Sequence, residues 1–274
     1  MLPTYRVILI TLSALALVMP AAGADELERA RLCNELIDFG NISDGLGTAN
    51  RNINADLVRL LEARSGCRIR TVLMPAKRVT SELRNGTLHM SARFFQTPER
   101  DAFLWFAHIQ RTKMLAWFRS DRVSPEDAAG FTSSEHLSLG VTVGFSHSAV
   151  IDSLVAGWRR EHPRNTVEFP DRKPLLQGLL DGRVDLVLLP ASTVEELAPV
   201  MNAAKVPLNS VDLTPGEPGA PGGIVLSKKL FDAEAAAQWQ ALIADLCEDG
   251  SILRVFQNYF KATEEDLACT LRKD

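Results

Sequence analysis

Met90-Ser-Ala-Arg-Phe-Phe-Gln-Thr-Pro-Glu-Arg100 is the stretch in which this chain passes from an apolar strand, ending near Ala92, to a polar turn. The turn carries Arg93, Thr97 and Arg100, and apolar residues resume at Phe103–Phe106. Open α/β sheets bind ligands at the C-terminal ends of their strands, so this turn is a candidate binding segment. A planar guanidinium suits a carboxylate because it donates two parallel hydrogen bonds. The alternative is that both arginines are solvated, as most arginines are.

Strands and helices alternate on both sides of this stretch. Apolar spacing, helix caps and glycine stops predict a βαβαβ unit in each half of the chain, which indicates parallel strands with helices on the sheet faces. The first unit comprises Leu36–Phe39, a helix from Asn54 to Gly66, Cys67–Leu73, a helix from Pro75 to Gly86, and Leu88–Ala92. The second comprises Leu137–Val143, Ala149–Glu161, Thr166–Phe169, Arg172–Asp181 and Val184–Leu189.

The segments outside these units complete the expected organisation. Asn41–Arg51 is expected to be a polar loop, and Pro207–Gly223 a link or exposed loop because it is rich in proline and glycine. Gly223–Ser227 is predicted to be a strand, and two helices follow, the second at Ile252–Phe260. This tail is too short for a domain of its own. We therefore expect lobe 1 at residues 25–118, lobe 2 at 119–218, and a return to lobe 1 at 219–274.

The first 24 residues have the features of a secretory signal. Arg6 precedes the apolar run Val7–Met19, which is short for a membrane span, and Ala22-Gly23-Ala24 fits a cleavage site. No cysteine follows that site, so a lipid anchor is not expected. Cleavage leaves 250 residues with 29 basic and 34 acidic side chains, a net charge of −5. The product should be soluble and exported, and no basic stripe indicates nucleic-acid binding.

The four cysteines are even in number and are expected to be paired in an exported chain. Three pairings are possible. We favour Cys33–Cys67, which would join the starts of two neighbouring strands, and Cys247–Cys269, which would anchor the tail to a helix. A metal site is disfavoured because there is no C-x-x-C motif and the five histidines are scattered along the chain. No cofactor is expected.

Gly144-Phe-Ser-His-Ser148 lies between a predicted strand and a predicted helix. It is similar to a nucleophile elbow, but Ser148 replaces the last glycine and no suitably distant histidine follows. Anion capture by backbone N–H groups and the Ser146 or Ser148 hydroxyl at a helix N-terminus is the better functional interpretation, and the alternative is that Ser148 is only a helix cap.

The aromatic residues beside these loops allow two interpretations. Phe94, Phe95 and Phe145 can pack in the core or form an apolar wall of a cleft. Arg78, near the start of a helix, is a further candidate cleft residue, although a solvated helix face is the simpler interpretation.

Six short patterns, in order, resemble those of the extracellular solute-binding proteins of family 3, the bilobed periplasmic proteins that serve polar amino-acid importers. The resemblance runs from about Leu36 to Phe260. The matching segments are Asn52-Ile-Asn-Ala-Asp56-Leu57, Leu83…Gly86…Leu88-His89, Thr97-Pro-Glu-Arg100 followed by Trp105-Phe106, Gly140-Val-Thr-Val-Gly144, Gly182-Arg-Val-Asp185, and Asp249-Gly250…Tyr259-Phe260.

The resemblance implies an α/β protein with a type II periplasmic binding protein fold: two βαβαβ lobes, two crossing strands and a cleft that closes on a ligand. It also implies that Arg100 grips a ligand carboxylate, that Thr97 supports its turn and that Ser146 binds from the second lobe. Three departures matter. Arg93 and Phe95 stand where small hydroxyl residues are usual, and Pro190 where an aspartate usually holds the ligand's ammonium. Asn41–Arg51 lacks the usual aromatic residue.

We therefore expect a non-enzymatic, monomeric periplasmic protein that captures a small carboxylate-bearing or anionic solute, with an inner-membrane ABC permease as partner. The candidate ligand-binding residues are Arg100, Thr97, Arg93, Phe95, Ser146, His147 and Phe145. Two alternatives stay open. One is a non-transport sensor domain of the same fold that acts on a membrane receptor. The other is an enzyme that resembles cyclohexadienyl dehydratases.

Overall fold

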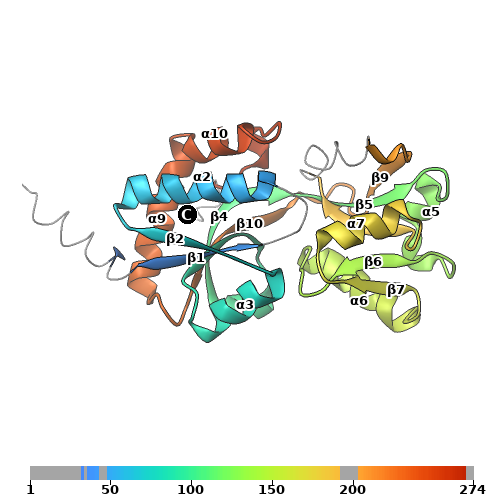
Figure 1. Cartoon of the computed structure of the whole chain (residues 1–274), viewed down its shortest axis with the longest axis horizontal. Coiled ribbons are helices and arrows are strands. Elements are labelled where there is room, and N and C mark those ends of the chain that lie inside the picture. The colour runs from blue at the N-terminus through green and yellow to red at the C-terminus, as the bar shows by residue number, and fades with distance from the viewer. Residues whose placement is uncertain (1–31, 34–35, 43–47, 192–202, 270–274) are drawn as a thin grey trace, which may run out of the picture.

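A computed structural model describes residues 32–33, 36–42, 48–191 and 203–269. The predicted signal segment and its cleavage site lie outside these residues. Within the described part of the chain, no helix is long and apolar enough to cross a membrane. The chain forms two lobes that lie side by side, each built on its own five-stranded sheet (Figure 1).

The first sheet has the order β2-β1-β3-β10-β4. β1 pairs in parallel with β2 and β3, whereas β10 is antiparallel to both β3 and β4. The strands are β1 (Ile37–Ile42), β2 (Ile69–Met74), β3 (Met90–Phe95), β4 (Leu104–Thr112) and β10 (Ala220–Ser227). The helices are α2 (Thr48–Ser65), α3 (Ala76–Asn85), α4 (Pro98–Asp101), α9 (Ala233–Glu248) and α10 (Ser251–Gln257). The predicted first βαβαβ unit is therefore confirmed.

The second sheet has the order β7-β6-β8-β5-β9, and β6 pairs in parallel with β7 and β8 while β5 is antiparallel to β8 and β9. Its strands are β5 (Met114–Arg119), β6 (Leu139–Thr142), β7 (Thr166–Phe169), β8 (Leu186–Pro190) and β9 (Leu208–Asp212). Its helices are α5 (Pro125–Ala129), α6 (Ala149–Glu161) and α7 (Arg172–Leu180). This repeats the order of the first lobe, as predicted.

The chain crosses between the lobes twice, first from β4 to β5 through Lys113 and later from β9 to β10. The sequence-based limit of the first lobe is residue 118, whereas the hydrogen bonds of Met114–Arg119 lie in the second sheet. Lys113 also forms an ion pair with Asp212, next to the second crossing. The two crossings therefore lie close together and join the lobes at one place.

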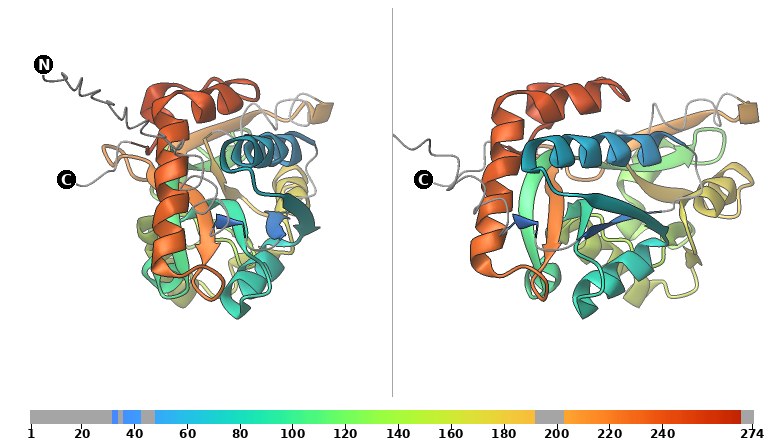
Figure 2. Two further views of the ribbon diagram at one scale, coloured as in Figure 1. Left: turned by 90° about the vertical axis from the view of Figure 1, so that its left-hand side faces the viewer. Right: turned by 60° about the vertical axis from the view of Figure 1, so that its left-hand side comes forward.

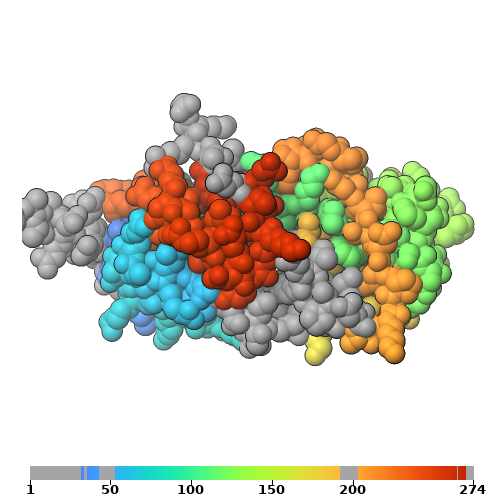
Figure 3. Space-filling model, turned by 90° about the horizontal axis from the view of Figure 1, so that it is seen from above, coloured from blue at the N-terminus to red at the C-terminus, as the bar shows by residue number. Residues whose placement is uncertain are grey.

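Buried apolar residues form a core on each face of each sheet. In the first lobe, α2, α9 and α10 cover one face around Phe39, Leu57 and Trp239, and α3 covers the other through Val79 and Leu83. Figure 2 shows α9 standing against β4, and Figure 3 shows the C-terminal helices beside α2. The tail thus completes the first lobe, and Trp158 and Leu179 belong to the two cores of the second.

Both expected disulfides are present. Cys33 is bonded to Cys67 and Cys247 to Cys269. The first bond joins Cys33, four residues before β1, to Cys67, two residues before β2, and these two strands pair in parallel. The second ties the end of α9 to the tail, as the sequence predicted.

Three local predictions were wrong. Asn41–Arg51 is not a loop throughout, because β1 extends to Ile42 and α2 begins at Thr48. Asn54 does not begin a helix, because α2 starts at Thr48 and Asn54 lies inside it, where its side chain donates to Asn41 Oδ1 at 2.7 Å. Pro207–Gly223 is not only a loop: Leu208–Asp212 forms β9, and β10 begins at Ala220. Pro221, Gly222 and Gly223 lie inside β10, and pairing with β5 and β4 decides the conformation of the segment.

Candidate functional site

A β-bulge at the end of β3 positions Arg93. Ala92 and Arg93 together lie opposite the single residue Ile224 of β10, between the pairs Ser91–Val225 and Phe94–Gly223. Arg93 has φ +64°, in the left-handed region that side-chain-bearing residues rarely adopt. Bulges redirect a side chain at the edge of a site. At this bulge, Arg93 forms part of the wall of a cavity between the lobes.

This interlobe cavity has a volume of about 50 Å³ and is walled by both lobes. Its first-lobe wall consists of Ile42, Asn54, Ala92, Arg93, Phe95, Gln110 and Thr112. Its second-lobe wall consists of Phe145, Arg172 and Pro190. A second cavity of about 30 Å³ shares Ile42, Phe145, Arg172 and Pro190 with it and is also lined by Asp171. Among the described residues that line the larger cavity there are two cations and no carboxylate.

Arg172 is the first residue of α7, directly after the turn that leaves β7. Asp171 caps this helix by accepting the Lys173 N–H at 3.0 Å. The Arg172 guanidinium carbon lies 5.7 Å from the centre of the Phe145 ring, so the two second-lobe residues of the cavity wall lie near each other. A cation at a helix N-terminus opposes the helix dipole, which favours an anion there. The sequence analysis placed Arg172 in a helix but missed it as a site residue.

Phe95 and Phe145 connect the two lobes through apolar contact. Phe95 belongs to β3 of the first lobe, yet it packs in the core cluster of the second lobe, against which Phe145 also packs. The lobes also meet where Gly144, with φ +74°, lies against Lys77 at the start of α3; a Cβ on Gly144 would lie 3.2 Å from Lys77 Cβ. Both aromatic residues therefore serve as core and as cavity wall.

Arg100 and Thr97 lie beside the cavity wall, and neither is among the residues that line the two interlobe cavities. Thr97 caps α4 by accepting the Arg100 N–H at 3.3 Å. Arg100 is 9% exposed, donates from Nη1 to the Phe95 carbonyl at 2.8 Å, and lies 4.9 Å from the centre of the Phe94 ring. These contacts support the strand end that carries Arg93 and Phe95. A role in gripping a ligand stays a prediction.

Burial of the Arg100 guanidinium lowers its pKa. The negative charges of Asp152 and Glu99 raise this pKa, but the effect of burial is larger. Asp152 belongs to α6 of the second lobe, so its charge acts across the gap between the lobes. The carboxylate of Asp152, near the start of α6, is thus close enough to act on the arginine of the turn that follows β3.

Ser146 and His147 hold a carboxylate of the chain itself. The Ser146 hydroxyl and the His147 N–H, at 3.0 Å, donate to Asp152, and His147 Nδ1 lies 3.1 Å from Asp152 Oδ1. Burial raises the pKa of Asp152, but these hydrogen bonds outweigh it, and the net pKa is lowered. Ser148 caps α6 by accepting the Ile151 N–H at 3.2 Å. The sequence analysis missed Asp152, and anion capture by Ser146 and His147 stays a prediction.

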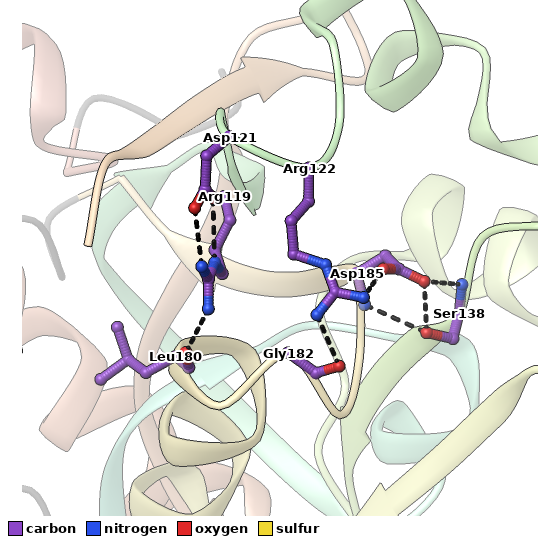
Figure 4. Close-up of polar contacts among 7 residues, drawn as sticks. All are labelled: Arg119, Asp121, Arg122, Ser138, Leu180, Gly182 and Asp185. Carbon is purple, nitrogen blue, oxygen red and sulfur yellow. Dashed lines mark hydrogen bonds and ion pairs between the residues drawn. The ribbon is translucent and has the colours of Figure 1, made fainter.

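The Gly182-Arg-Val-Asp185 motif holds the second sheet together away from the cavities. Asp185 accepts hydrogen bonds from the Ser138 N–H and hydroxyl, at 2.9 and 2.6 Å, and forms an ion pair with Arg122 (Figure 4). Arg122 also donates to the Gly182 carbonyl at 2.9 Å. Pro190, five residues after Asp185, lies at the other end of β8 and lines the cavity. The position where the resemblance implies an ammonium-binding aspartate is therefore in the cavity wall and is uncharged.

Arg78 lies outside the cavity walls. Its side chain is mostly exposed on α3 and donates to Glu82 at 2.8 Å, which fits the solvated interpretation. In the described ranges, no group of three or more His, Cys, Asp or Glu side chains could hold a metal ion.

Comparison with known proteins identifies the fold through solved structures. No protein-family model and no curated protein sequence matches the chain. An ancestral arginine-binding protein bound to arginine has a TM-score of 0.67 and 17% identity, covering 82% of this chain and 98% of that one. A histidine kinase sensor domain with similarity to periplasmic binding proteins has a TM-score of 0.65 and 16% identity, covering 82% and 96%.

A third similar structure is an ancestral amino-acid-binding protein described as a precursor of cyclohexadienyl dehydratase. Its TM-score is 0.66 at 15% identity, and the match covers 87% of this chain and all of that one. At 15–17% identity, these similarities establish the fold of the chain. The same fold occurs in binding proteins and in a sensor domain.

Proposed function

We propose that this chain, whose fold is that of the type II periplasmic binding proteins, captures a small anionic solute between its lobes. The observation that carries the proposal is the position of Arg93 and Arg172, which come from different sheets and line one cavity. Each guanidinium has five N–H donors and can grip a carboxylate while keeping other contacts. A solute held by both would link the lobes.

The cavity wall favours an anion over an ordinary amino acid. The described wall of the larger cavity has no carboxylate to hold an ammonium group, and Pro190 occupies the position at which the resemblance implies one. Phe95 and Phe145 supply apolar surface for the carbon part of a solute. The solved arginine-binding relative binds a cationic amino acid, so the proposed ligand class differs from that of this neighbour.

The proposal places the protein in the periplasm as a monomer, delivered by the predicted signal segment, with an inner-membrane ABC permease as its partner. What supports this is the fold, which is shared with periplasmic binding proteins, and the N-terminal sequence pattern.

A sensor or receptor-partner domain is the second candidate. It is favoured by the likeness to a histidine kinase sensor domain and by the packing of Phe95 in the core cluster of the opposite lobe. Such packing lets the two lobes present one continuous surface to a receptor. A cyclohexadienyl-dehydratase-like enzyme is less favoured, because the described wall of the larger cavity holds no Asp, Glu or His to serve as general acid or base.

A thermal-shift screen of the purified protein tests the proposal. The panel contains amino acids, dicarboxylates, aromatic acids and small phosphates, with prephenate and arogenate checked for turnover by absorbance. A solute at 100 times its dissociation constant stabilises by about 2.7 kcal/mol, which raises Tm by about 5–10 °C. The shift should fall to about half or less in Arg93→Gln and Arg172→Gln, because tenfold weaker binding leaves about 1.4 kcal/mol of this stabilisation, and it should be kept in Arg78→Gln. A panel without any shift would refute solute binding and favour the sensor candidate.

A further inference from the structure

Asn54 adds a third polar group to the interlobe cavity. The residue is 5% exposed and lines the cavity from α2. Its Nδ2 donates to Asn41 Oδ1 at 2.7 Å, whereas its Oδ1 is buried and accepts no hydrogen bond from the described residues. A buried acceptor without a donor is costly, and a donor supplied by a solute removes that cost. The cavity wall therefore presents a hydrogen-bond acceptor as well as two cations.

The two cations line the cavity from different lobes. Arg93 comes from the bulge of β3 in the first lobe and Arg172 from the start of α7 in the second. α7 has nine residues, and its N-terminal dipole adds to the attraction for an anion at Arg172. A solute with one carboxylate can engage either guanidinium at close range, and a solute with two can engage both.

The rest of the wall restricts the chemistry of such a solute. Phe95 and Phe145 are apolar and suit a short carbon chain between two carboxylates. Inorganic phosphate has oxygens on all sides and would bury hydrogen-bond acceptors against these rings. An ammonium group at Asn54 would share the cavity with two guanidinium groups, and like charges repel. A hydroxyl donates to the same oxygen without a charge.

We infer that the ligand is a small hydroxylated dicarboxylate. One carboxylate binds Arg93, the other binds Arg172, and the hydroxyl donates to Asn54 Oδ1. This inference rests on the proposed function and narrows its ligand class. The bound dianion spans the two lobes and stabilises their contact.

Isothermal titration of the purified chain tests the inference with five probes: L-malate, succinate, L-lactate, L-aspartate and inorganic phosphate. Malate should bind about tenfold tighter than succinate, since it adds one hydrogen bond. It should bind at least about tenfold tighter than lactate, which lacks the second carboxylate. Aspartate and phosphate should also bind more weakly than malate.

Three variants assign the contacts. Arg93→Gln and Arg172→Gln should each reduce the preference for malate over lactate. Asn54→Ala should bind malate and succinate equally and should still bind succinate, which shows that the variant is folded. Asn41→Ala is the matched control, because it breaks the same side-chain pair but leaves Asn54 Oδ1 in the cavity; its malate preference should persist.

The outcomes separate this inference from the proposed function. If lactate or phosphate binds as tightly as malate, and Arg93→Gln still weakens binding at least about tenfold, the hydroxydicarboxylate inference is overturned while anion capture stands. If aspartate binds more tightly than malate, the assignment of a hydroxyl to Asn54 is overturned. If no anion binds, both proposals fail.

Discussion

Replacing Arg93 by glycine should give a more stable protein than replacing it by alanine, and either variant should weaken anion binding at least about tenfold. The backbone at Arg93 is left-handed, with φ +64°, which costs a side-chain-bearing residue about 1–2 kcal/mol. Glycine adopts this conformation freely but loses about 0.5–1 kcal/mol through the greater freedom of its unfolded chain. Arg93→Gly should therefore exceed Arg93→Ala in unfolding free energy by about 0.5–1 kcal/mol, since both variants lack the guanidinium.

Urea unfolding followed by fluorescence measures this difference, and thermal unfolding should show it as a Tm higher by about 1–4 °C. The matched control is Ala92→Gly in the same bulge, where φ is not positive. There glycine should destabilise by about 0.5–1 kcal/mol. A second control is Lys205→Gly, at φ +52°, which should raise stability and leave binding unchanged. If Arg93→Gly is less stable than Arg93→Ala, the claim that the bulge stores strain at the site is refuted.

Three further predictions concern the framework. Phe95→Ala should cost about 3–5 kcal/mol in urea unfolding, because the ring is buried between the lobes; a cost below about 1 kcal/mol would argue against that packing. Replacing Cys247 and Cys269 together by serine should lower the unfolding free energy by about 3 kcal/mol, and an unchanged midpoint would show that the bond does not constrain the tail. Hydrogen bonds from Ser251 lower the pKa of Asp249 to about 2, so this carboxylate stabilises the fold above about pH 4, and its contribution is lost as the pH falls to 2. In Asp249→Asn, the unfolding free energy should change less between about pH 4 and pH 2 than in the wild-type protein. An identical pH profile in both proteins would contradict this role.

The general fold could be predicted from the sequence because both lobes follow local rules. Helix-stop glycines such as Gly86, with φ +76° after α3, come two residues before a buried segment, and the alternation of elements indicates parallel sheets. β9 was not predictable because its five residues have no strong apolar alternation and depend on pairing with β5. The start of α2 was misplaced because Asn54 has a typical capping side chain, which here donates to Asn41 instead.

The candidate site was predictable only in part. The sequence analysis selected Arg93, Phe95 and Phe145, and all three line the interlobe cavity. It gave most weight to Arg100. When several polar residues follow a strand, the sequence does not show which of them will stack on a neighbouring ring, as Arg100 does on Phe94. Only the register of β3 and β10 shows the bulge that places Arg93.

Arg172 had one local signal that the sequence analysis did not use. It is a cation in the first turn of a helix, where an acidic residue is more usual. Its proximity to Arg93 depends on the contact between the lobes, which no local pattern encodes. The same holds for Asp152, whose partners Ser146 and His147 are local but whose effect on Arg100 acts across the lobes.

The central claim is that one solute is held by both lobes at once. The most direct test is the dissociation constant of the tightest-binding anion, measured by calorimetry for the wild-type protein, Arg93→Gln and Arg172→Gln. Each substitution should weaken binding at least about tenfold, although the two residues belong to separate sheets, because each removes a charge-assisted hydrogen bond. Unchanged affinity in either variant would contradict the claim.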